Sequence, residues 1–245
     1  MEWAFERFSL YDFFNLIFSG GLFLLGLQFF GVPVISHVKY SVGLPDNDIL
    51  YLFVMFLLCY VAGFILQVLG AWLEKHIFRS QSRMVNTLLS ERDSIVHNKA
   101  KLQIYQSKAR EVLRRKGIAF SEQGFSSEQS EYFFAYCSYV NQMSGRCAKA
   151  EKMRALKGLA MQWSVCFALL AVIGIISLGC LAAWSAPLAD VVWTLLEMGT
   201  CASLSVLCFS QMLQNLKYWI RMVLAMYEAI DDLGFAGGER NRNEG

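Results

Sequence analysis

The chain has 245 residues, of which 56% are hydrophobic and 17% are charged, and its formal net charge at pH 7 is +2. This composition is too apolar for an ordinary soluble domain, and it excludes a disordered chain and a disulfide-rich secreted domain. The small net charge also excludes a basic nucleic-acid-binding module formed by the whole chain, so direct nucleic-acid binding is not expected.

The charged residues are concentrated in one part of the chain. Of the 22 Lys and Arg residues, 16 lie between Lys75 and Lys157, and long apolar stretches flank this region. We therefore predict a membrane protein with one soluble insert.

Four segments are long and apolar enough to cross about 30 Å of hydrocarbon. These predicted spans are 13–32, 49–72, 159–184 and 191–213. The first is a span rather than a signal peptide, because little positive charge precedes it and no cleavage site follows it. We predict an all-α, polytopic membrane fold with four transmembrane helices. Its parts are a first transmembrane pair (1–72), a cytoplasmic helical hairpin insert (73–158), a second transmembrane hairpin (159–213), and an amphipathic helix with a mobile tail (214–245).

The distribution of cations predicts the orientation of these spans. The loop between the first two spans has only Lys39, and the turn 185–190 has no cation. Because positive charge is retained inside, both termini and the insert are predicted to be cytoplasmic. The seven cysteines lie in the spans or in the insert, with no partner on the outer side, so we expect free thiols.

Apolar spacing in the insert is typical of two helices. The first runs over 74–116, with a possible break at 90–94, and Gly117 ends it. The second runs from Ser127 towards Lys157, and Ser126 with Gln129 has the spacing of a capping box. We expect an antiparallel hairpin that continues the second and third spans.

Past the fourth span, apolar residues recur at helical spacing over 214–233. This amphipathic helix covers the apolar side of the insert or lies along the membrane surface. We favour packing on the insert, because the helix leaves the membrane directly from a span. The residues 237–245 are expected to form a mobile tail.

Glu197 is the only ionisable residue well inside a predicted span, about 10 Å below the outer end at 1.5 Å per residue. An acid at that depth is a candidate functional residue. It either bonds to Gln28, at similar depth on the first span, or lines an oligomeric pore as a ring of carboxylates. A third interpretation is a shorter span that leaves Glu197 near water.

Other polar and small residues mark the spans. Asn15, Gln67 and Gln211 fall at comparable depth near the cytoplasmic ends, where they form a polar vestibule or, as we favour, hydrogen-bond locally near the headgroups. Small residues allow helices to pack closely, within one subunit or between subunits. They include Gly20, Gly21, Gly26, Gly174, Gly179, Gly199 and Ser203.

The insert holds a basic cluster of Arg110, Arg114, Arg115 and Lys116. It binds anionic lipid, a nucleotide or a protein partner, or it is only a solvated helix face. The three histidines have no partner at metal-ligand spacing, and no nucleotide-binding or hydrolase motif is present. We therefore expect no metal site, no cofactor and no catalytic residue.

Tyr11-Asp12 leads to Gly20-Gly21 at the start of the first span, and the segment 150–156 enters the third span. Both patches resemble segments of bacterial four-span inner-membrane proteins with a helical cytoplasmic insert, some of them membrane subunits of anti-phage defence systems such as Kiwa. Such families often have Pro before the glycine, where this chain has Ser19. The resemblance implies an oligomer in the bacterial inner membrane that senses phage or changes membrane integrity with a cytoplasmic partner.

Two hypotheses from different classes remain. In the first, the protein is a non-enzymatic sensor or scaffold, whose spans anchor a homo-oligomer in the lipid bilayer and whose insert, 73–158, docks a cytoplasmic protein. In the second, it is an ion channel or pore-forming effector gated by its cytoplasmic helices. A membrane enzyme acting on lipid is a third class.

Overall fold

The computed structural model describes residues 10–34, 48–90, 95–96, 98–118, 124–145, 148–183 and 187–240. Several predicted features lie outside these ranges. They are Lys39, the histidines His37 and His97, Cys147, and the last residues of the tail, 241–245.

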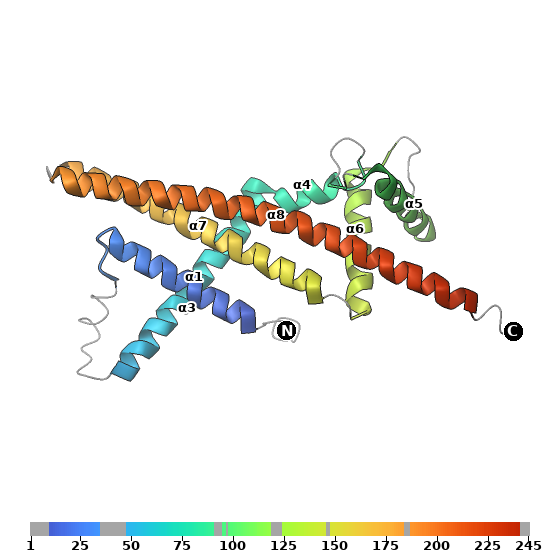
Figure 1. Ribbon diagram of the computed structural model, residues 1–245, viewed down its shortest axis with the longest axis horizontal. Coiled ribbons are helices and arrows are strands. Elements are labelled where there is room, and N and C mark those ends of the chain that lie inside the picture. Colours follow the sequence, from blue (N-terminus) through green and yellow to red (C-terminus); the bar gives the residue numbers. More distant parts are fainter. Residues whose placement is uncertain are drawn as a thin grey trace. The chain divides into compact units, whose positions relative to one another are not determined.

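Throughout the described ranges the regular structure is helical, as predicted, and contains no strand. The elements are α1 (Leu10–Phe29), α3 (Asp48–Leu73), the π-helical turn η2 (Glu74–Phe78), α4 (Ser80–Asn86), α5 (Lys99–Arg115), α6 (Ser127–Met143), α7 (Ala148–Ala183) and α8 (Leu188–Arg240) (Figure 1).

Among the described residues, three helical segments are long and apolar enough to cross a membrane. They are Ile49–Phe78, Ala148–Ala183 and Leu188–Asp231. The segment predicted as the first span lies in α1, whose apolar stretch Phe13–Phe29 is shorter. The structure therefore has three candidate spans and one shorter apolar helix.

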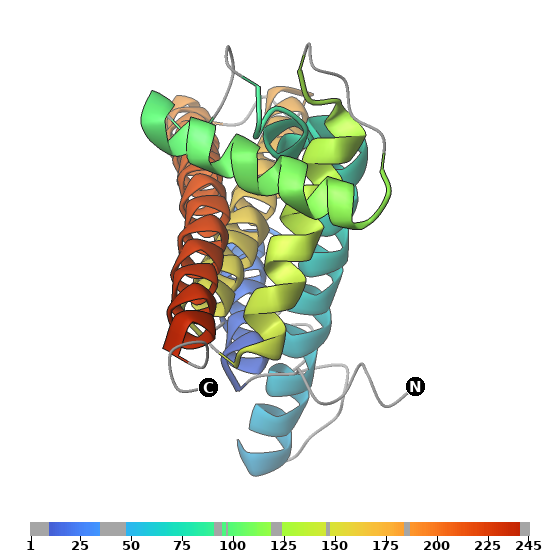
Figure 2. The ribbon, with the colours of Figure 1, turned by 90° about the vertical axis from the view of Figure 1, so that its right-hand side faces the viewer.

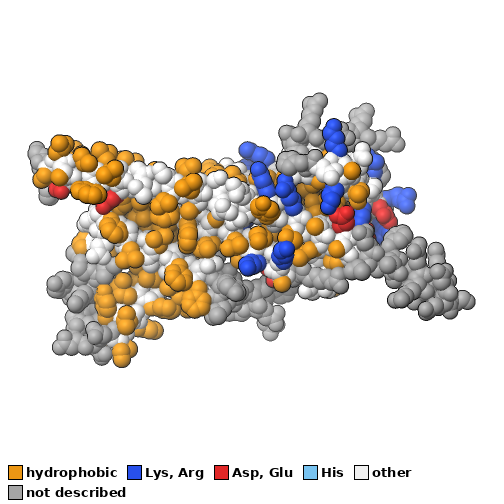
Figure 3. All heavy atoms as spheres, in the orientation of Figure 1, with side chains coloured by type: hydrophobic (Ala, Val, Ile, Leu, Met, Phe, Trp, Pro, Cys, Tyr) orange, Lys and Arg blue, Asp and Glu red, His pale blue; other side chains and the backbone are white. Residues whose placement is uncertain are grey.

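The chain divides into two compact units. The first unit comprises Met1–Leu73 and Ala155–Met212, and the second comprises Glu74–Arg154 and Leu213–Gly245. Each of the long helices α7 and α8 contributes residues to both units. Hydrophobic side chains cover the helices of the first unit, and the Lys and Arg side chains gather on the second (Figure 3).

In the first unit, α1 and α3 are in backbone contact. A Cβ atom added to Gly20 would lie 1.8 Å from the main-chain oxygen of Cys59, and one added to Gly63 would lie 1.9 Å from that of Leu16. No side chain fits at either position, so these glycines permit the approach of the two helices. On α7, Leu170 occupies the space above Gly26 in the same way.

Two expected helices of the insert are interrupted. The first was expected over 74–116 with a possible break at 90–94. The structure has an interruption there, but a wider one, since α4 ends at Asn86 and α5 begins only at Lys99, and it has a second break that was not expected at Arg79, with φ 47, between η2 and α4. Asn98 caps α5, because its side-chain oxygen accepts hydrogen bonds from the main-chain N–H groups of Ala100 and Lys101.

The second expected helix, Ser127 towards Lys157, is also split. Ser126 and Gln129 form the predicted capping box at the start of α6. However, α6 ends at Met143, Gly145 has φ 67, and α7 begins at Ala148. A glycine in the left-handed region ends a helix, since it adopts that conformation without a steric penalty.

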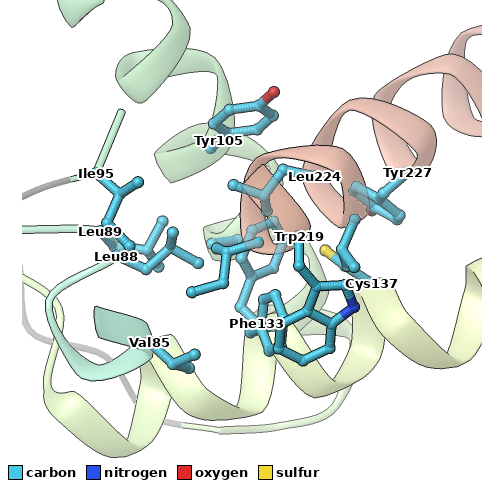
Figure 4. Packing of buried hydrophobic residues seen from close by; sticks show 14 of the residues in the cluster. Val85, Leu88, Leu89, Ile95, Tyr105, Phe133, Cys137, Trp219, Leu224 and Tyr227 are labelled. Atoms are coloured by element: carbon cyan, nitrogen blue, oxygen red, sulfur yellow. The ribbon is translucent and has the colours of Figure 1, made fainter. Parts of the chain in front are cut away.

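The core of the second unit joins α4, α5 and α6 to the later part of α8. Figure 4 shows Phe133 of α6 and Trp219 of α8 within one cluster of buried side chains. The ring of Phe134 meets Trp219 edge-on at 5.3 Å, and that of Phe133 meets Tyr227 at 5.8 Å. Complete burial of one such ring contributes about 1.5–3 kcal/mol. Of the two alternatives for the C-terminal amphipathic helix, the structure therefore has packing on the insert.

The same part of α8 is longer than expected. It was predicted to end at Gly234, but α8 continues to Arg240. In Figure 2, α5 lies across α6 and the C-terminal part of α8. These three helices enclose the aromatic core.

Candidate functional site

Glu197 is half-buried on α8, in the first unit, and Gln28 is exposed near the end of α1. Among the described residues, no hydrogen bond joins these two side chains. The contact that the sequence suggested between Gln28 and Glu197 is therefore not present within the described part of this chain.

The polar residues expected at the cytoplasmic span ends are separate as well. Asn15 is half-buried on α1, whereas Gln67 on α3 and Gln211 on α8 are exposed. In the part of the chain that is described, no hydrogen bond links Asn15 to Gln67.

Buried polar contacts instead form at positions that the sequence did not single out as partners. Ser19 on α1 donates its hydroxyl hydrogen to Oε1 of Gln162 on α7 at 3.1 Å, and both side chains are buried. Ser164 on α7 and Ser205 on α8 form a reciprocal pair, in which each hydroxyl donates to the other residue's main-chain oxygen, at 3.1 and 2.9 Å. In an apolar surrounding, such bonds fix which helix faces are in contact.

A signal for the first of these contacts was available. Gln162 is an amide within the apolar run 159–184, and an amide there needs a hydrogen-bond partner. Its partner, Ser19, is a small residue beside Gly20, and so it can be reached in a closely packed interface.

Three cations of the basic cluster, Arg110, Arg114 and Arg115, lie in the C-terminal half of α5, Lys116 follows its last residue, and all four are exposed. The guanidinium of Arg110 lies 5.6 Å from the centre of the Phe125 ring, and Arg115 pairs with Glu111 one turn earlier. Within the described residues, Arg110, Arg114 and Lys116 have no carboxylate partner.

Lys116 lines a shallow hollow of about 280 Å³ at the end of α5. The rest of the lining comes from α6 and is mainly aromatic. It consists of Tyr132, Ala135, Tyr136 and Tyr139. The basic cluster and an aromatic surface therefore meet at this point of the second unit.

A polar junction holds the C-terminal part of α8 against α5. The hydroxyl of Tyr105 donates to Oε2 of Glu228 at 3.0 Å, and the ammonium of Lys108 lies 2.9 Å from Asp231. Burial, and then the hydrogen bond to Glu228, raise the pKa of Tyr105 above its usual value. Burial likewise raises the pKa of the nearby Cys137 thiol. These groups stay neutral at physiological pH, which is typical of a structural role.

The six described cysteines are free thiols, as predicted. The described residues contain no group of three or more His, Cys, Asp or Glu side chains that could hold a metal ion. Comparison of the chain with protein-family models, with curated proteins and with solved structures gave no match.

Proposed function

We propose that this chain is a four-span protein of the bacterial inner membrane, with both termini and the second unit in the cytoplasm. Its spans anchor a homo-oligomer, and its second unit docks a cytoplasmic protein. The protein is not itself an enzyme. By its resemblance to membrane subunits of anti-phage systems, we place it in phage defence.

The observation that carries this proposal is the composition of the second unit. Residues of the insert and of α8 share one aromatic core, and α8 is continuous with an apolar segment long enough to cross a membrane. The charged part of the chain forms a packed helical module with unpaired cations at its surface. Such a module is suited to binding another protein rather than to catalysis.

Topology is the first test. In a variant whose native cysteines are replaced by Ser, single cysteines introduced at exposed positions of the second unit, such as Gln103, should be labelled by a membrane-impermeant maleimide only after the inner membrane is opened. Labelling in intact spheroplasts would place the second unit outside and would contradict the proposal.

The docking function is tested by purification from the native host in mild detergent. A cytoplasmic protein encoded beside this chain should co-purify in fixed stoichiometry, and deletion of either gene should lower resistance to infecting phage to the same extent. Normal phage resistance after both deletions would contradict the proposed role in defence. The absence of any stoichiometric partner would contradict the proposed docking function.

An ion channel is the alternative, and the face of α8 around Glu197 favours it. Gly199 has no neighbouring atom within 4 Å of an added Cβ, and Ser203 is exposed. A second copy packed on this face would bring the half-buried Glu197 carboxylates close to an oligomer axis. Within one chain, Ser203 donates its hydroxyl to the main-chain oxygen of Gly199 at 2.8 Å, so this hydroxyl is already satisfied.

Ion flux in liposomes separates the two functions. If the protein is a channel, the unaltered chain should conduct ions and Glu197→Gln should change the ion selectivity. Ser203→Ala is the control and should leave the selectivity unchanged, because it removes a hydroxyl that is already satisfied. Absence of ion flux in every state would contradict the channel, and docking would be the one function of the two that remains.

A further inference from the structure

α6 has apolar residues on two faces, and only one of them belongs to the core. Phe133, Phe134 and Cys137 are buried, whereas Tyr132, Tyr139 and Met143 are 36%, 59% and 73% exposed. The exposed residues follow at helical spacing, with half-buried Tyr136 between them. We name the set Tyr132, Tyr136, Tyr139 and Met143 the outer face of α6.

The outer face is attached rigidly to the core. The ring of Tyr136 lies 6.0 Å from that of Tyr227 on α8, at an angle of 74°. Tyr136 therefore holds the middle of the face in place, and its neighbours on either side extend into solvent. Rigid tyrosines, together with Met and Arg, are enriched at the centres of protein interfaces.

The hollow of about 280 Å³ lies on this face and gives it a definite shape. Its volume is at the small end of the range for ligand pockets, and its lining is mainly apolar. Its polar groups are the Lys116 ammonium and the tyrosine hydroxyls, and most of its surface is apolar, which is the contact area that a large apolar side chain needs. The hollow therefore suits an anchoring side chain from another protein.

The charged residues beside the hollow indicate which charge the partner carries next to its anchoring side chain. Lys116 lines the hollow, Arg114 is exposed in the turn just before it, and neither has a carboxylate partner among the described residues. Glu128 and Glu131 are exposed in the turn of α6 that precedes Tyr132. A partner with a carboxylate beside its anchor is attracted at the α5 end, and the two acids disfavour further negative charge at the N-terminal end of α6.

We propose that the outer face of α6, with Lys116, is the docking surface for an acidic amphipathic helix of the cytoplasmic partner. The helix inserts one large apolar side chain into the hollow and places a carboxylate against Lys116. This inference rests on the proposed docking function and names the surface and the chemistry of the partner.

The test uses the full chain in nanodiscs and a fluorescent 16-residue helical peptide with Leu and Trp on one face and Glu along the edges of that face. Two matched peptides replace every Glu by Lys or every apolar residue by Ala. We expect binding of the acidic peptide alone, with an affinity that falls at least tenfold in Tyr132→Ala/Tyr139→Ala and in Lys116→Glu.

Tyr218→Ala is the matched control, because Tyr218 is 58% exposed on α8 and does not line the hollow. It should bind the acidic peptide as the unaltered chain does, and all variants should keep the same helical circular dichroism. Equal affinity in the double tyrosine variant, or an equal loss in Tyr218→Ala, would overturn the assignment of the surface.

Two further outcomes are distinguishable. Because the chain has six Trp residues, the emission of Tyr139→Trp is compared with that of the unaltered chain. A blue shift on addition of anionic vesicles without peptide, seen only in Tyr139→Trp, would make the face a membrane contact and would overturn the inference. If the native partner co-purifies equally with the double tyrosine variant, docking stands and this surface is wrong. If the native partner is lost in the double tyrosine variant but not in Tyr218→Ala, both the docking function and the assignment of this surface are supported.

Discussion

Ser19 and Gln162 are 143 positions apart in the chain, and yet the hydroxyl of one donates to the amide oxygen of the other at 3.1 Å. Both side chains are buried, so the bond forms away from solvent. It joins α1, the shorter apolar helix, to α7. The position of α1 in the first unit is therefore specified by a polar contact as well as by apolar packing.

This contact predicts a non-additive pair of substitutions. Ser19→Ala leaves the Gln162 amide without its partner, and Gln162→Leu leaves the Ser19 hydroxyl without an acceptor. Each should lower the stability of the protein in detergent, while the double variant should lose less than the sum, with a coupling of about 0.6–1.7 kcal/mol. Thermal unfolding of the four proteins measures the coupling, and strict additivity would show that the bond is absent in solution.

The neighbouring glycines allow a sharper steric test. Gly20→Ala places a methyl group against a main-chain oxygen of α3, whereas a Cβ at Gly21 would lie 3.6 Å from the Cys59 sulfur, an ordinary contact. We expect Gly20→Ala to separate α1 from α3 and to lower the apparent unfolding temperature by several degrees. Gly21→Ala is the matched control and should change it little. Similar behaviour of the two variants would contradict the close approach of these helices.

Local signals in the sequence located helix ends where a side chain or a glycine determines them. Ser126 with Gln129 predicted the start of α6, and Gly117, at φ 69, follows the end of α5 as expected. Gly145 is the same kind of signal but was taken as the interior of a helix, because the apolar spacing continues on both sides of it. Periodicity thus detects helices more securely than it detects breaks between them.

Contacts between helices could not be predicted in the same way. The depth of Gln28 and Glu197 in their spans suggested a bond, but depth does not specify which way each side chain faces around its helix. The basic cluster at the end of α5 was identified from its composition. The aromatic surface that meets it depends on how α6 packs on α8, which no local pattern records.

Arg79 is the residue between η2 and α4, and its φ of 47 lies in the left-handed region. A residue with a branched Cβ is strained there, and Gly is not. Arg79→Val should therefore destabilise the second unit by about 1–2 kcal/mol relative to Arg79→Gly. Arg83, in the last turn of α4, is the control position. There the order should reverse, so that Arg83→Gly is less stable than Arg83→Val, because Gly is the poorer helix former and costs about 1 kcal/mol relative to Ala. Chemical unfolding followed by circular dichroism compares the variants, and the same order at both positions would argue against the left-handed conformation.

The buried thiol of Cys137 predicts how the stability of the second unit depends on pH. Burial raises the pKa of this thiol in the folded protein above its value of about 8.5 in an unfolded chain. Below pH about 8.5 both states keep the proton, so the thiol adds no pH dependence. Above it, the unfolded state releases a proton that the folded state retains, and the free energy of unfolding falls by about 1.4 kcal/mol per pH unit.

Between pH about 8.5 and 10 the tyrosines, whose pKa is about 10 in an unfolded chain, are only partly ionised, and the difference in slope between the unaltered chain and Cys137→Ala isolates the contribution of this thiol. Tyr105 and Tyr227 also have raised pKa values through burial, so they steepen the loss above pH about 10. Cys137→Ala should lower stability at pH 7, since it leaves a small cavity, but should flatten the slope between pH 8.5 and 10 by about 1.4 kcal/mol per unit. Unfolding by urea at a series of pH values measures both. An unchanged slope in Cys137→Ala would mean that the thiol is exposed to solvent in the folded protein, contrary to its place between α6 and α8.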